Sequence, residues 1–164
     1  MSTTTPIALT DFSRDEYGIH QVSPDSLLNY GRALLIIAGA DGEVAPEEMR
    51  WLLHHQRKFG VPPEIIAQYE TYDFRHADLA EVFRTVRVDH DTWQGARHLL
   101  YHALQMASAD GVLHDAERAK VIEAAHQLGL TDDITHGLIA LVELERSATA
   151  LRQSLLGLPR PTAP

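Results

Sequence analysis

Four carboxylates at matching positions are the residues of this chain best suited to chemistry. Asp41 and Glu48 belong to the string Ala-Asp-Gly-x5-Glu, and Asp110 and Glu117 belong to a second copy that lies 69 residues further along the chain. Carboxylate oxygens are the ligands that hard divalent cations such as calcium and magnesium prefer. The repeat therefore predicts one acidic turn used twice, with a cation as a candidate ligand.

This spacing matches the second half of an EF-hand calcium loop, which has Asp at position 5, Gly at position 6 and Glu at position 12. The first half is missing, because Ile37 and Gly39 stand at positions 1 and 3 of the first copy. A full EF-hand is therefore excluded. Two interpretations remain: a weaker cation site completed by carbonyls and water, or helix caps that each stabilise the fold by about 1 kcal/mol.

A pair of histidines gives a second candidate metal site. His98 and His102 are spaced i, i+4, which places both imidazoles on one helix face, as in helical zinc or iron sites. The pair lies off the apolar stripe of its helix, so it is expected to be either exposed or covered by another segment. Such a site needs a third ligand from elsewhere, and the candidates are Glu48, His54, His55 and Asp110.

The composition of the chain argues against several kinds of partner, binding site and cellular location. The chain has 164 residues, a net charge of −9 and no cysteine. The negative charge argues against a nucleic-acid partner, and the absence of cysteine excludes disulfides and thiolate metal sites. No apolar run approaches the length of a membrane span, and the N-terminus does not resemble a signal peptide. We therefore expect a cytoplasmic protein with no membrane span.

Spacings of three and four between apolar residues predict an all-α fold of about seven helices and no strand. Two helix–turn–helix repeats are expected to be related by a pseudo-twofold axis. We expect an N-terminal arm over 1–22, a helical domain over 23–156 and a disordered tail over 157–164. The expected helices are 24–40, 46–59, 63–70, 78–86, one from about 92 to 107, 116–128, and one from 132 to 145 that continues or restarts through 156.

The strings ADGEVAPEE and ADGVLHDAE, each after an Ala-containing apolar helix, resemble the tellurite-resistance TerB family. The resemblance covers roughly residues 27–145. It implies an all-helical domain with acidic residues near the ADG turns, and an association with metal stress, metal binding and membrane-linked response complexes. Its acidic positions fall on Asp41, Glu48, Asp110 and Glu117. The chain differs from the family pattern in its ten histidines, among them His98 and His102 before the second turn.

Three functions follow as hypotheses. The first is a TerB-like module that binds a metal ion or a protein partner in metal or oxidative stress. The second is a helical metalloenzyme with a His/carboxylate site at His98 and His102. The third is a scaffold in which every motif residue is a cap. The metal ions considered are calcium and magnesium for the carboxylates, and zinc or iron for the histidines.

Overall fold

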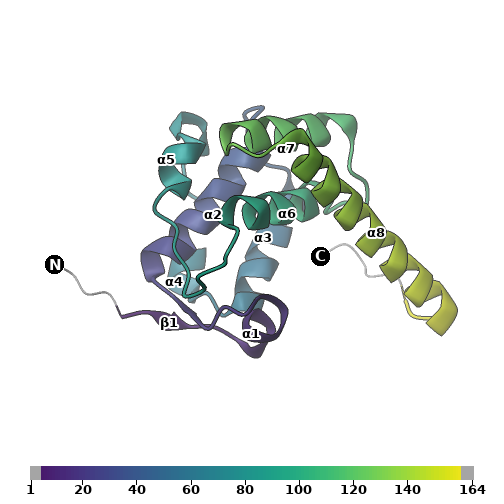
Figure 1. The fold of residues 1–164 in the computed structure, drawn as a ribbon, viewed down its shortest axis with the longest axis horizontal. Coiled ribbons are helices and arrows are strands. Elements are labelled where there is room, and N and C mark those ends of the chain that lie inside the picture. Colours follow the sequence, from purple (N-terminus) through teal and green to yellow (C-terminus); the bar gives the residue numbers. More distant parts are fainter. Residues whose placement is uncertain (1–4, 160–164) are drawn as a thin grey trace.

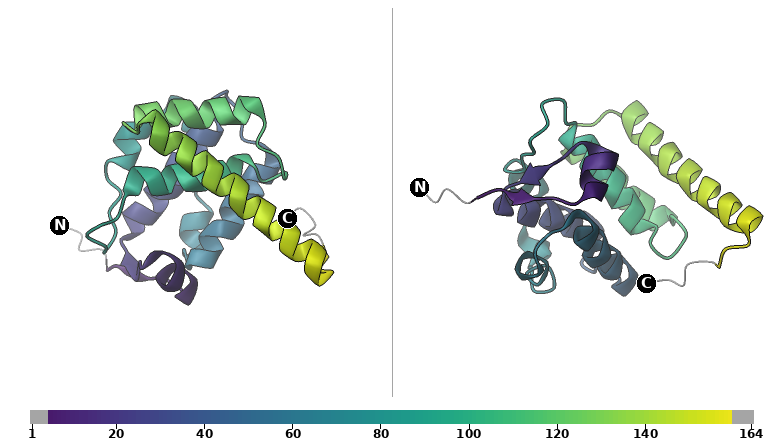
Figure 2. Two further views of the ribbon diagram at one scale, coloured as in Figure 1. Left: turned by 45° about the vertical axis from the view of Figure 1, so that its right-hand side comes forward. Right: turned by 90° about the horizontal axis from the view of Figure 1, so that it is seen from below.

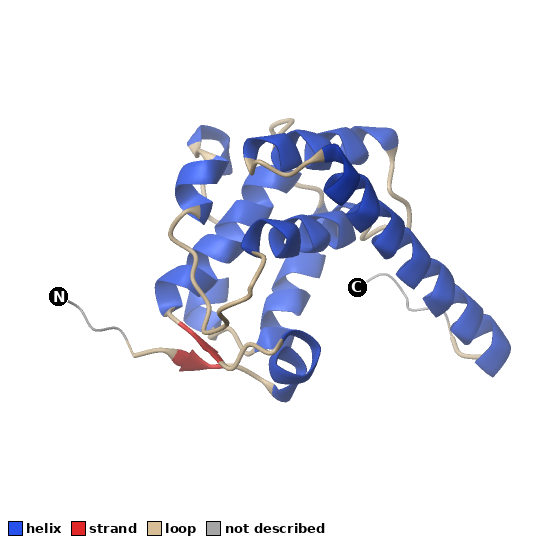
Figure 3. Cartoon of the chain, in the orientation of Figure 1, coloured by secondary structure: helices blue, strands red, loops and turns tan. Residues whose placement is uncertain are grey.

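The computed structural model describes residues 5–159, and nearly all of its regular structure is helical (Figure 3). This agrees with the predicted all-α fold. The described elements, in chain order, are β1 (Ile7–Ala8), α1 (Asp11–Tyr17), β2 (Gln21–Val22), α2 (Pro24–Ala38), α3 (Pro46–Phe59), α4 (Pro63–Ile66), the 3-10 helix η1 (Phe74–His76), α5 (Leu79–Phe83), α6 (Gly95–Ala107), α7 (Asp115–Gln127) and α8 (Asp132–Leu156).

Helix α2 is the centre of the domain and contacts α3, α4, α5, α6 and α7 (Figure 1). It begins as predicted, with Pro24 in its first turn and the Ser23 hydroxyl accepting a hydrogen bond from the Ser26 amide at 3.2 Å. Leu34 and Leu35 are fully buried at its middle. Because α2 is apolar on more than one face, helices can pack around it from several directions.

The two ADG strings form matching turns, one between α2 and α3 and the other between α6 and α7. Gly42 and Gly111 adopt φ angles of 99° and 101°, which a residue with a Cβ rarely adopts. In each turn the Asp carboxylate accepts a hydrogen bond from the amide two residues later, at 3.3 Å for Asp41 and 2.9 Å for Asp110. The predicted repeat is therefore present as two helix–turn–helix units with the same turn chemistry.

Residues 5–22, the described part of the expected N-terminal arm, contain regular structure. Strands β1 and β2 pair antiparallel with Ile7 opposite Val22, and α1 lies between them. The Thr10 amide donates to the Phe59 carbonyl at 3.2 Å, which ties this region to the end of α3. The expectation of no strand was wrong for these two short strands, because two-residue segments are too brief to show alternation. Of the predicted tail, residues 160–164 lie outside the described residues.

Several helix ends differ from the expected ones. Helix α4 ends at Ile66 instead of about residue 70, because the Gln68 and Tyr69 amides bond to carbonyls three residues back and tighten the chain into turns. Helix α6 begins at Gly95, since the Thr92 amide bonds to the His90 ring in a preceding turn. Helix α8 is continuous to Leu156. None of the described helices is both long and apolar enough to cross a membrane.

Candidate functional site

The aspartates of the two turns mainly close those turns. The carboxylates of Asp41 and Asp110 are about half exposed, at 57% and 46%. Asp110 also contacts the His114 ring at 3.0 Å, and the Val112 amide together with His114 holds the pKa of Asp110 below its usual value. This is the geometry of an Asx-turn rather than of a helix cap, because the bonded amides of Glu43 and Val112 precede α3 and α7, whose N-cap residues are Ala45 and His114.

The glutamates of the two turns meet in the interior. Glu48 in α3 and Glu117 in α7 line the same small cavity, of about 10 Å³, between α2, α3, α6 and α7. One Glu48 oxygen accepts a hydrogen bond from the Ala45 amide at 2.9 Å, as in a capping box. The other Glu48 oxygen and one Glu117 oxygen are buried without a hydrogen-bond partner. The repeat therefore brings two carboxylates, far apart in the chain, to one place.

A lysine that the sequence did not single out lies at the same cavity. The Lys120 ammonium in α7 is 3.1 Å from the Asp41 carboxylate and donates to the Ala38 carbonyl at 3.1 Å. It thus connects the second repeat to the first turn. The spacing between the repeats could not indicate this role, because the equivalent position in the first repeat is Trp51.

Burial changes the acidity of Glu48. Desolvation raises the pKa of this carboxyl, and the negative charges of Glu117 and Asp41 act in the same direction. The Ala45 amide and the charge of Lys120 oppose that rise. Buried carboxylates normally have hydrogen-bond or charge partners, so the unpartnered oxygens of Glu48 and Glu117 are unusual.

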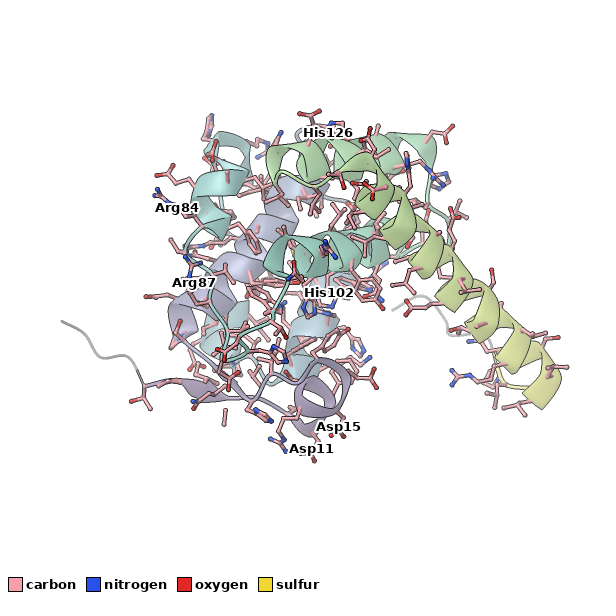
Figure 4. All side chains as sticks on the ribbon, viewed as in Figure 1. Asp11, Asp15, Arg84, Arg87, His102 and His126 are labelled. Atoms are coloured by element: carbon pink, nitrogen blue, oxygen red, sulfur yellow. The ribbon has the colours of Figure 1, made fainter. Side chains whose placement is uncertain are left out.

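The predicted histidine pair lies in a separate, aromatic cluster. His102 is 1% exposed, and its two ring nitrogens lie 2.6 Å from the Tyr30 hydroxyl and 3.2 Å from the Tyr17 hydroxyl. His98 accepts a hydrogen bond from the Trp93 indole at 2.6 Å. Other segments therefore cover the pair, which agrees with the second of the two expectations, that the pair is covered rather than exposed. Figure 4 shows His102 beneath α6, facing the interior.

His55 from α3 joins this cluster. Its ring centroid lies 4.2 Å from that of His102 and 4.5 Å from that of Trp51, on which it is stacked. Burial lowers the pKa of His55 to about 3 and the pKa of His98 to about 4, and it lowers the pKa of His102 well below its usual value. All three imidazoles are therefore neutral near pH 7.

Neutral imidazoles can bind metals, but this cluster is not arranged for it. Across residues 5–159, no three His, Asp or Glu side chains are grouped so that they could hold one metal ion. Both nitrogens of His102 already face tyrosine hydroxyls, and both nitrogens of His55 are buried without partners. The cluster lines an almost wholly apolar cavity of about 50 Å³. Its described geometry resembles core packing more than a catalytic centre.

Comparison with known proteins shows which family and which solved structure this chain is similar to. The family model for "Tellurite resistance protein TerB" matches residues 58–138, which contain the second ADG turn and its flanking helices. A crystal structure of a tellurite resistance protein from Nostoc punctiforme is similar over 92% of this chain and 93% of its own, with 28% sequence identity and a TM-score of 0.77. A search of curated proteins gave no match.

Residues 58–138 therefore match the TerB family, and the fold of the chain as a whole is TerB-like. The solved relative extends the likeness beyond the residues that the family model matches, since the aligned region includes most of the first repeat as well. This confirms the resemblance drawn from the two ADG strings. Within the TerB-like chain, Glu48 and Glu117 are the motif residues that the fold brings together, whereas Asp41 and Asp110 remain in their own turns.

Proposed function

We propose that this TerB-like chain is a binding module that holds one small divalent cation between its two repeats, with Glu48 and Glu117 as ligands. The observation that carries the proposal is the shared cavity, at which each glutamate leaves one buried oxygen without a partner. A cation there would pair with both oxygens and offset the cost of burying them.

The donor set indicates the class of cation. Carboxylate oxygens suit hard ions such as Mg²⁺ and Ca²⁺, and Mg²⁺ is often held by only one or two protein carboxylates. When ionised, Asp41, Glu48 and Glu117 carry three negative charges against the one positive charge of Lys120, so a net charge of −2 surrounds the cavity. A divalent cation would neutralise it. Lys120 competes for the same carboxylates, and we therefore expect weak binding.

We infer the cellular role from the similarity to the TerB family. The Nostoc punctiforme relative is named a tellurite resistance protein. A cation-binding helical module fits a part in the response to metal or oxidative stress, in which cation occupancy would change the contact between the two repeats. Because Glu48 lies in α3 and Glu117 in α7, a cation between them would link the repeats directly.

Isothermal titration calorimetry on protein without a histidine tag, stripped with a chelator, tests the proposal. Mg²⁺ or Ca²⁺ should bind at one site per chain. Glu48→Gln and Glu117→Gln should each weaken this binding at least about tenfold, a loss of about 1.4 kcal/mol. Glutamine retains the capping hydrogen bond of Glu48, so the fold should be preserved.

Glu47→Gln is the matched control, because Glu47 precedes Glu48 in α3 and pairs with Arg50 at the surface. It should leave cation affinity unchanged. The absence of any Mg²⁺ or Ca²⁺ binding, or equal affinity in the Glu48→Gln variant, would overturn the proposal and leave Glu48 as a helix cap.

A further inference from the structure

The second half of α8 projects beyond the rest of the domain and carries a row of exposed leucines (Figures 1 and 2). Leu144, Leu151 and Leu155 are 67%, 60% and 75% exposed. Together with the exposed Ala148, they stand at intervals of four, three and four residues. This is the a/d spacing of a coiled-coil seam, in which apolar residues recur every 3.5 residues on average.

The seam, defined as Leu144, Ala148, Leu151 and Leu155, lies on the side of α8 that faces away from the domain. The inner side is marked by Ile139 and Val142, which are 3% and 2% exposed. At about 100° per residue, the centre of the seam lies roughly 150° around the helix from these buried residues. A second helix could therefore reach the seam without displacing the domain.

The projecting segment has little support from its own domain. Among residues 5–159, the hydrogen bonds and ion pairs that join α8 to other helices end at Glu143, which pairs with Arg118, and Glu145, which accepts from Tyr101. The remaining eleven residues, 146–156, form fewer turns than an isolated helix needs to be stable in water. Their helical conformation and their leucines both indicate a packing partner.

We propose that this partner is a second copy of the chain, paired antiparallel along the seam. With the twofold axis between residues 149 and 150, Leu144 faces Leu155 of the second copy, and Ala148 faces Leu151 of the second copy. The symmetry repeats both contacts, which gives four apolar layers. Each layer combines an a position with a d position, as antiparallel pairing requires, so the surface is complementary to itself.

The charges beside the seam favour the antiparallel orientation. Glu145 and Arg152 both occupy the e position, which flanks the apolar layers. In an antiparallel pair, e positions face one another, so Glu145 lies near Arg152 of the second copy and the pair occurs twice. In a parallel pair, each e position faces a g position, and the nearest g residue to Arg152 is the uncharged Ser147. Only the antiparallel arrangement therefore brings the opposite charges of Glu145 and Arg152 together across the dimer.

The seam is short, at about 16 Å between Leu144 and Leu155 along the axis. Four layers bury much less surface than the roughly 1,600 Å² of a stable protein interface. We therefore expect reversible dimerisation that depends on concentration. The interaction uses no residue of the cation site, so the dimer can be tested independently of the proposed cation binding.

Light scattering after size exclusion, from low micromolar to near-millimolar protein, measures the dimer. The mass should rise towards twice that of the monomer, and Leu151→Glu should keep the chain monomeric throughout. Val112→Glu is the control, because Val112 is also apolar and 52% exposed but lies outside α8. A wild-type chain that stays monomeric at every concentration overturns the proposal, as does a dimer that Leu151→Glu leaves intact.

Cysteine cross-linking tests the orientation, since the natural chain has no cysteine. An equal mixture of Leu144→Cys and Leu155→Cys chains should form a disulfide between the two variants under mild oxidation. Leu144→Cys alone should not cross-link, because antiparallel pairing separates the two copies of residue 144 by about 16 Å, well beyond disulfide reach. Efficient cross-linking of Leu144→Cys alone would indicate a parallel pair and overturn the antiparallel assignment.

Discussion

His55 of α3 and His102 of α6 lie edge to face with their ring centroids 4.2 Å apart, so two imidazoles form part of the contact between the two repeats. Both are buried, at 7% and 1% exposed. Burial disfavours the charged imidazolium, and each ring would also repel the other if both carried a proton. The fold therefore depends on keeping these side chains neutral.

This dependence predicts acid lability. His55, His98 and His102 have lower pKa values in the folded state than in the unfolded chain, so the unfolded chain binds more protons as the pH falls below about 6.5. Their contribution to stability is complete above that pH and is lost progressively towards pH 4. Urea unfolding followed by circular dichroism should show a free energy of unfolding that is nearly flat from pH 7 to 8 and falls steeply below pH 6. A flat profile down to pH 4.5 would contradict neutral burial.

Replacement of His55 by Phe should stabilise the protein. Both His55 nitrogens are buried without a hydrogen-bond partner, and an unsatisfied buried polar group costs about 1–3 kcal/mol. A phenyl ring is similar in size and can keep the stacking on Trp51. We expect His55→Phe to raise the free energy of unfolding by about 1 kcal/mol at pH 7 and by more at pH 5. His54→Phe, at the exposed neighbouring position, should give no such gain.

The fold could be predicted well from sequence because its signals are local. Ser23 with Pro24, and Gly42 and Gly111 after apolar helices, mark helix ends through backbone chemistry within a few residues. The shortest elements could not be predicted in the same way. Strands β1 and β2 exist because residues 5–22 pack on the end of α3, and that contact spans about fifty residues of chain.

The candidate sites were predictable only as lists of residues. Spacing identified Glu48 and Glu117 individually, but their convergence depends on how α3 and α7 pack against α2, which no local pattern encodes. The tyrosines that bond His102 come from α1 and α2, and nothing in the i, i+4 spacing of His98 and His102 points to them. Lys120 was missed for the same reason, because its partners Ala38 and Asp41 are distant in the chain.

Two helical glycines should respond oppositely to alanine. A Cβ on Gly31 of α2 would lie 2.3 Å from the Tyr69 ring. Tyr69 is 1% exposed, and its hydroxyl donates a hydrogen bond to the Leu27 carbonyl. We expect Gly31→Ala to lower the free energy of unfolding by about 1–3 kcal/mol, because this overpacking exceeds the gain in helix propensity. Gly137 of α8 has no atom within 4 Å of its added Cβ. Gly137→Ala should therefore raise stability by up to about 1 kcal/mol in the same urea assay.

Substitution of Lys120 by Met gives the sharpest prediction for the carboxylate cavity. It removes the positive charge near Asp41, Glu48 and Glu117 while it keeps an apolar stem of similar length. The charge around the cavity changes from −2 to −3, so a divalent cation should bind about tenfold more tightly or better. Without a cation, the pKa of Glu48 should rise further, since Lys120 now opposes that rise. The variant should then be less stable than the wild type in chelator and should recover on addition of Mg²⁺ or Ca²⁺.

Lys58→Met is the control for this experiment, because Lys58 is exposed on α3 and lies over the Phe12 ring rather than at the cavity. Titration calorimetry and urea unfolding, each with and without cation, should show no change in cation affinity for Lys58→Met. Equal affinities in Lys120→Met and the wild type would place any bound cation away from Lys120. Stabilisation of Lys120→Met in chelator would show instead that the two glutamates share a proton and need no positive charge beside them.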